Sequence, residues 1–156
     1  MSKIIRPIPI DNFPEIETNC FGFAIGNIDI KGESKIYNLN PYLPLADSFL
    51  SKLKHLGYTN LPRKIDSLED AKDNEYVLMI YGFKWKRARN DSILGFSRGK
   101  KYPDYHILRR ELSGIWVHKS GWKNKPCIVT SNDWNSLSRD FGHNFALLAF
   151  KPEKEE

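Results

Sequence analysis

The chain has 156 residues, of which 40% are hydrophobic and 13% aromatic, so it is long enough for one domain with a closed core and too short for two. This composition excludes an intrinsically disordered chain. With 24 Lys and Arg against 19 acidic residues, the net charge is +5, a mildly basic balance that favours anionic partners without identifying one.

The first half of the chain predicts an extended arm and two helices. Residues 1–17 alternate apolar and polar residues around prolines, as an extended arm does. Thr18 and Asn19 are preferred N-cap residues, and the apolar run after them predicts a short buried helix that ends near Gly26. The segment LADSFLSKLKHLGY has apolar residues at helical spacing, which predicts an amphipathic helix over residues 45–56. The polar segment SLEDAKD predicts one further short helical turn.

From residue 75 onward the sequence predicts strands, because apolar, β-branched and aromatic residues dominate short segments. These segments are EYVLMIYGF, DYHILRRE, GIWVHK, KPCIVTSND and NFALLAFKP. A short polar turn at residues 112–114 predicts that the second and third form a hairpin, and SNDWNSLSRDF predicts a helical turn. Helices followed by an antiparallel sheet indicate an α+β domain, which we expect to span residues 1–150 with a charged tail at 151–156.

Two features bear on the compartment. No run of about 18 apolar residues occurs, so we expect no membrane-spanning helix. The segment MSKIIRPIPIDNFPE lacks the apolar stretch of a Sec signal peptide. With only two cysteines, Cys20 and Cys127, we expect no structural disulfide and a cytoplasmic location in the producing cell. Action elsewhere would require delivery without a Sec signal.

Cys20 is the first candidate for chemistry. It begins the predicted helix, where unpaired backbone N–H groups favour a thiolate, the nucleophilic form of cysteine. A small core residue beside Phe21 and Phe23 is the alternative interpretation of the same position.

Two histidines lie on the predicted hairpin, His106 on one strand and His118 at the far end of the next. Strand alternation puts Tyr105 and Ile107 on one face and His106 on the other. With the turn at residues 112–114, the two histidines are nearly opposite one another, so one imidazole could orient the other as in a nucleophile–base–orienter triad. Two solvated strand residues are the alternative.

The order of a cysteine at a helix start, a histidine on a strand and a polar residue on the next strand resembles the papain-like superfamily. The segments NCFGFAIG and DYHILRRELSGIWVHKSG are most similar to its compact bacterial cell-wall peptidase and amidase branch, whose third residue is often a histidine. About 26 of the 156 residues carry this resemblance. That branch usually has a small residue after its cysteine, whereas here Phe21 follows, which leaves the substrate open.

The resemblance implies a papain-like fold with N-terminal helices packed on a C-terminal antiparallel sheet. It implies that Cys20 attacks a carbonyl group, that its own backbone N–H forms half of an oxyanion hole, and that His106 transfers the proton. His118 would hold the imidazole of His106 in the correct tautomer. Asn19, Tyr105 and Trp116 would lie at the oxyanion or substrate side of the site, although Asn19 is also a simple helix cap.

Other candidates have weaker support. Cys127 in the strand-like KPCIV reads as structural, and no CxxC, HxxxH or similar spacing predicts a metal site, so we expect no metal and no cofactor. The stretch KWKRAR, with Lys84, Lys86, Arg87 and Arg89, interleaves charge and aromatic residues, as nucleic-acid binders do. A basic surface loop is the alternative, as is one wall of a substrate cleft.

The sequence therefore predicts a cysteine hydrolase that cleaves an amide or peptide bond. Peptidoglycan stem peptides are the first substrate class, and a protein substrate, by proteolysis or glutamine deamidation, is the second. The size and the missing signal fit a toxin, a delivered effector or a phage protein. The alternative is a non-catalytic binding protein that contacts nucleic acid or a protein partner.

Overall fold

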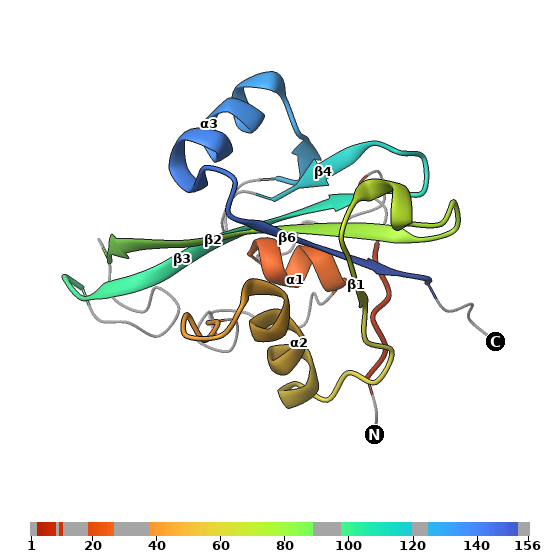
Figure 1. Ribbon diagram of the computed structural model, residues 1–156, viewed down its shortest axis with the longest axis horizontal. Helices are drawn as coiled ribbons and strands as arrows, with labels where there is room; N and C mark the ends of the chain where they lie inside the picture. The colour runs from red at the N-terminus through yellow and green to blue at the C-terminus, as the bar shows by residue number, and fades with distance from the viewer. Residues whose placement is uncertain are drawn as a thin grey trace.

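The computed structural model describes residues 3–8, 10, 19–26, 38–88, 98–119 and 125–152. Within these residues lie three α-helices, one short 3-10 helix and an open antiparallel sheet of six strands (Figure 1). The predicted α+β class is confirmed at this level. The predictions that concern Thr18, Arg89 and the last four residues of the tail lie outside the described residues.

The two predicted N-terminal helices are present. Helix α1 (Cys20–Ile25) begins after Asn19, whose side-chain oxygen accepts a hydrogen bond of 3.0 Å from the Gly22 N–H. It ends at Gly26, which has a φ of 75°. A Cβ atom at Gly26 would lie 2.0 Å from the Arg6 carbonyl oxygen, so only glycine lets the N-terminal arm pass this close. Helix α2 (Leu45–His55) follows the predicted amphipathic pattern.

The sheet has the strand order β1-β6-β2-β3-β4-β5, and every neighbouring pair is antiparallel. The strands are β1 (Arg63–Ile65), β2 (Tyr76–Arg87), β3 (Lys101–Arg110), β4 (Trp116–His118), β5 (Cys127–Ile128) and β6 (Phe145–Phe150). The last strand in the chain therefore inserts between the first two, and the predicted hairpin is formed by β3 and β4.

Three details differ from the sequence-based expectation. Strand β1 lies before residue 75, where the sequence predicts no strand. Its three residues pair with β6, and this pairing supplies hydrogen bonds that so short a segment could not form alone. The SLEDAKD segment contains only a 3-10 turn, η3 (Leu68–Asp70). The segment at 131–141 is a full helix of eleven residues, α3 (Ser131–Phe141), which begins with a capping box between Thr130 and Asp133.

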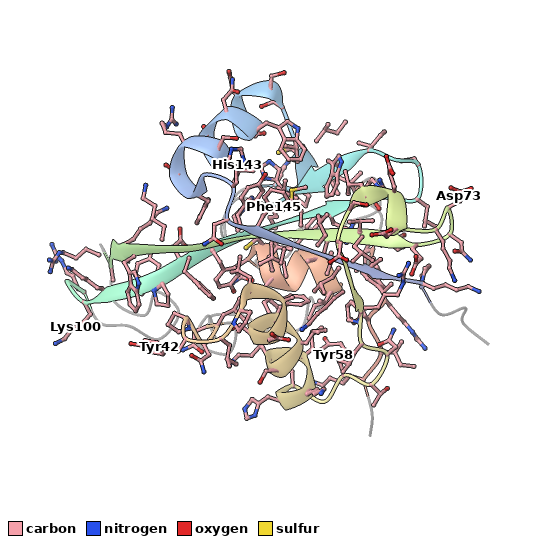
Figure 2. All side chains as sticks on the ribbon, viewed as in Figure 1. Tyr42, Tyr58, Asp73, Lys100, His143 and Phe145 are labelled. Carbon is pink, nitrogen blue, oxygen red and sulfur yellow. The ribbon has the colours of Figure 1, made fainter. Side chains whose placement is uncertain are left out.

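The sheet is covered on both faces, which also corrects the expectation that the helices are all N-terminal. Helices α1 and α2 lie on one face and α3 lies on the other (Figure 1). Two separate apolar clusters result, one beneath α1 and α2 and one beneath α3. The side chains fill the space on both sides of the strands (Figure 2). Residues that alternate along β2 and β3 thus enter different cores.

Arg109 on β3 is fully buried beneath α1 and connects three parts of the chain. Its guanidinium donates hydrogen bonds of 2.9 Å to the Phe23 carbonyl of α1 and 2.8 Å to the Ile8 carbonyl of the arm. It also pairs with the Glu111 carboxylate at 3.1 Å. The guanidinium lies 4.4 Å from the centre of the Phe23 ring. These contacts fix α1 against β3.

We predict that Arg109→Met destabilises the fold by about 3–5 kcal/mol, because it removes the cation that pairs with the buried Glu111 carboxylate and the hydrogen bonds to the Phe23 and Ile8 carbonyls. Urea unfolding followed by circular dichroism measures this change. Arg110→Met is the matched control, since the neighbouring side chain points to the other face, and it should change the free energy of unfolding by about 0.5 kcal/mol. Equal losses in both variants would contradict the role of Arg109.

Candidate functional site

The candidate site is built around β3, whose alternate residues face different helices. Tyr105 and Ile107 belong to the apolar cluster that contains Cys20 and the two N-terminal helices. Leu108, and with it His106, points to the opposite face, where the cluster beneath α3 lies. The alternation predicted from the sequence is therefore confirmed.

His106 and His118 are in direct contact. Nε2 of His106 lies 2.8 Å from Nδ1 of His118, and the two rings meet edge to face with their centroids 5.1 Å apart. Val117 lies opposite Arg109, so the two histidines are diagonal rather than direct cross-strand neighbours. The predicted histidine pair is confirmed, with a diagonal register between the two strands.

Asp133 extends this contact to helix α3, and sequence reasoning did not single it out. Its Oδ2 lies 3.2 Å from Nε2 of His118, at an angle that falls short of good hydrogen-bond geometry. The same oxygen accepts a hydrogen bond of 2.9 Å from the Thr130 N–H in the capping box. The spacing of Thr130 and Asp133 could have marked the helix start, but not its approach to β4.

Cys20 lies at the first turn of α1 and is 7% exposed. Burial raises the pKa of its thiol to about 12, although the backbone N–H groups of Ile107, Phe21 and Cys20 itself act in the opposite direction. The N–H groups at the helix start therefore lower the pKa of the thiol as predicted, but burial raises this pKa by more. The sulfur lies beside the N–H of Ile107, the residue that follows His106.

Among the described residues, no hydrogen bond joins the sulfur of Cys20 to either imidazole. The thiol approaches β3 from the side of α1, whereas the imidazole of His106 leaves the strand on the side of α3. The direct Cys20–His106 pair therefore stays a prediction. The structure brings the sulfur to the backbone next to His106 and brings His106 to His118.

Both imidazoles are neutral near pH 7. Burial, with a smaller effect from His118, lowers the pKa of His106 to about 3. Burial also lowers the pKa of His118, which the Asp133 carboxylate partly offsets. Within the described residues, Nδ1 of His106 has no hydrogen-bond partner, whereas its Nε2 is occupied by His118. Nδ1 is also the ring nitrogen nearer to the main chain of β3.

The remaining predicted site residues lie in different surroundings. Asn19 is buried and caps α1 through its side-chain oxygen. Tyr105 packs in the core beside Cys20 and is 5% exposed. Trp116 shares the α3 face with His118 and meets Trp134 of that helix edge to face, with the ring centroids 5.8 Å apart. Of the three, Trp116 is the one on the face of the histidines.

The basic stretch on β2 is largely neutralised within the chain. Nζ of Lys84 lies 3.3 Å from Asp140, Nζ of Lys86 lies 2.7 Å from Asp104, and Arg87 donates to the Gly99 carbonyl. These strand ends project from the body of the sheet, near Lys100 in Figure 2.

Three further expectations concern Cys127, a metal site and a membrane-spanning helix. Cys127 lies on a strand as expected, β5, where it is exposed and directly opposite His118 in the strand register. In the described part of the chain, no group of three His, Cys, Asp or Glu side chains is arranged to hold a metal ion. Nor does any described helix have the length and apolarity needed to cross a membrane.

The comparisons with known proteins add no relative. No family model, no curated protein and no solved structure matches the chain. The site is therefore interpreted from its own residues.

We predict that acid destabilises the fold through His106. Its pKa is about 3 when folded against an ordinary value of 6.5, so the folded state binds fewer protons between these values. The free energy of unfolding should fall as the pH is lowered from 6.5 towards 3. His106→Gln removes this titration and should flatten the acid side of the stability curve, as measured by urea unfolding at several pH values.

Proposed function

We propose that the chain is a papain-like cysteine hydrolase that cleaves an amide or peptide bond, with Cys20 as nucleophile, His106 as base and His118 as its orienting partner. The observation that supports it most is the 2.8 Å contact between Nε2 of His106 and Nδ1 of His118. That contact occupies one nitrogen of His106 and leaves Nδ1, on the backbone side, available for a proton. The Cys20 sulfur lies beside the next backbone N–H of the same strand.

The proposed reaction uses these atoms in a definite order. The sulfur of Cys20 attacks the carbonyl carbon while its proton passes to Nδ1 of His106, and the backbone N–H of Cys20 donates to the oxyanion that forms. Collapse of this intermediate expels the amine, which takes the proton back from His106 and leaves a thioester. Water then attacks the thioester, giving its proton to His106, and the carboxylic acid departs from the regenerated thiol.

The protonation states define the type of catalysis. The thiol has a pKa of about 12 and His106 a pKa of about 3, so both groups are neutral at rest and no thiolate–imidazolium pair is stored. Proton transfer then accompanies the attack, as in general base catalysis. In the free protein the sulfur lies on the α1 side of β3 and the imidazole of His106 on the α3 side, so the reaction requires a rearrangement that brings Nδ1 within hydrogen-bond reach of the sulfur when substrate binds.

Two substrate classes follow from this proposal. A peptidoglycan stem peptide is the first to test, because the resemblance to cell-wall peptidases rests on the segments that hold Cys20, His106 and His118. A protein substrate, by proteolysis or glutamine deamidation, is the second, since the same groups attack either amide. The net charge of +5 suits an anionic polymer or a peptide carboxylate.

The alternative, a binding protein that contacts nucleic acid through the basic stretch, has less support. Trp85 is 52% exposed between Lys84 and Lys86, which favours such a surface. However, both lysines already pair with carboxylates of the chain. Binding a phosphate would require these pairs to open.

We predict that Cys20→Ala and His106→Ala each lower activity by about 1,000-fold or more, and that the double variant is little worse, because the two groups act as a unit. His118→Ala should cost less, since the base itself remains. The measurement is muropeptide cleavage, or growth arrest on expression, compared at equal amounts of folded protein. Cys20→Ala should lower the free energy of unfolding by only about 1 kcal/mol. A folded Cys20→Ala protein with the full phenotype would exclude the hydrolase and favour the binding protein.

A second prediction needs no substrate. In a Cys127→Ser background, which leaves one thiol, we expect His106→Gln to slow the alkylation of Cys20 by iodoacetamide at pH 7 by about tenfold or more. Glutamine keeps much of the volume of histidine but cannot accept the thiol proton. Intact-protein mass spectrometry measures the rate of alkylation. Equal rates with histidine and glutamine at position 106 would show that the two groups are not coupled.

A further inference from the structure

We infer that Asp133 is a positioning residue of the site, which fixes the proton of His118 on Nε2 and so leaves the lone pair of His106 on Nδ1. This inference rests on the proposed function for its catalytic consequence, but the arrangement of protons follows from contacts that are independent of it. Asp133 joins α3 to a site that otherwise consists of α1, β3 and β4.

The first step concerns the nitrogen that faces the carboxylate. Oδ2 of Asp133 lies 3.2 Å from Nε2 of His118, and the His118 side chain is only 4% exposed. A carboxylate offers lone pairs and no proton, so a bare lone pair on the buried Nε2 of His118 would be repelled by it, even though the Asp133 side chain itself is 34% exposed. Nε2 of His118 must therefore hold its hydrogen.

The second step carries this choice to His106. A neutral imidazole has one N–H, so Nδ1 of His118 is then an acceptor. Nε2 of His106, at 2.8 Å from that atom, must be the donor. The lone pair of His106 consequently lies on Nδ1, the nitrogen that the proposed reaction uses as base. One carboxylate thereby sets the tautomers of two rings in series.

The third step explains why Asp133 stays ionised and in place. Its Oδ2 accepts a hydrogen bond of 2.9 Å from the Thr130 N–H, and its own N–H donates 3.1 Å to the Thr130 hydroxyl. The N–H of Thr130, with smaller effects from the Thr130 hydroxyl and from His118, holds the pKa of the Asp133 carboxyl below its ordinary value, although burial acts in the opposite direction. Because the capping box begins α3, the start of this helix determines where the carboxylate lies.

The test is the tautomer of His118, read from long-range proton–nitrogen NMR spectra of the full chain labelled with ¹⁵N. We expect the wild type to show Nε2–H on His118 and on His106. Asp133→Ala removes the acceptor and should shift His118 to the Nδ1–H form or to a mixture. Asp133→Asn can place its oxygen where Oδ2 lies, so this conservative variant should keep the wild-type tautomer.

Two controls separate this role from a merely structural one. Asp140→Ala removes the other α3 carboxylate that pairs with a basic side chain, Lys84, and should leave both tautomers unchanged. Thr130→Ala removes the hydroxyl of the capping box but keeps the backbone N–H that donates to Oδ2 of Asp133, so it should also leave them unchanged. If the wild-type chain holds the His118 proton on Nδ1, or if Asp133→Ala does not alter it, the inference is wrong.

The catalytic consequence has its own readout. Asp133→Ala should slow the alkylation of Cys20 in the Cys127→Ser background by about 10- to 100-fold. This slowing should not exceed the one that His106→Gln causes, because that variant removes the base itself. Asp133→Asn should recover most of that rate, and Asp140→Ala should retain it. If Asp133→Ala shifts the tautomer of His118 without changing the alkylation rate, Asp133 sets the proton positions as inferred but has no part in the mechanism. Failure of the hydrolase itself would appear separately, as a folded Cys20→Ala protein with full activity.

Discussion

The hydrogen bond from the Arg109 guanidinium to the Phe23 carbonyl ties the helix of Cys20 to the strand of His106. A charge buried this deeply is stable only with all its partners in place, and they come from α1, the N-terminal arm and Glu111. The chain therefore has little freedom to slide α1 along β3. Because Arg109 joins the carbonyl of Phe23 to β3, it contributes directly to the position of the thiol relative to that strand.

Burial decides the charge states around the site. The N–H groups near the sulfur of Cys20 favour a thiolate, yet removal of the thiol from water has the larger effect and keeps it protonated. The same desolvation keeps His106 neutral. A neutral thiol and a neutral imidazole avoid the cost of two buried charges at rest, and in the proposed reaction charge develops only when a substrate carbonyl is present to accept it.

Much of the local structure was predictable because it rests on short-range patterns. Asn19 and Gly26 delimit α1 through capping and a left-handed φ, both of which are properties of the residues themselves. The β3–β4 hairpin and the pairing of His106 with His118 follow from the strand period and one short turn. The relation of Asp133 to His118 had no such signal, since it joins two elements that do not pair as strands.

The sequence by itself determined the helices α1 and α2, the face from which each β3 side chain leaves, and the contact between the two histidines. Each of these depends on fewer than about 20 consecutive residues, over which backbone geometry has a fixed period. Only the tertiary structure decided the insertion of β6 between β1 and β2, the packing of α3 on the second face and the burial of Cys20. Those features arise from contacts between distant segments, whose geometry no local period sets, and they determine both the pKa of the thiol and the carboxylate that faces His118.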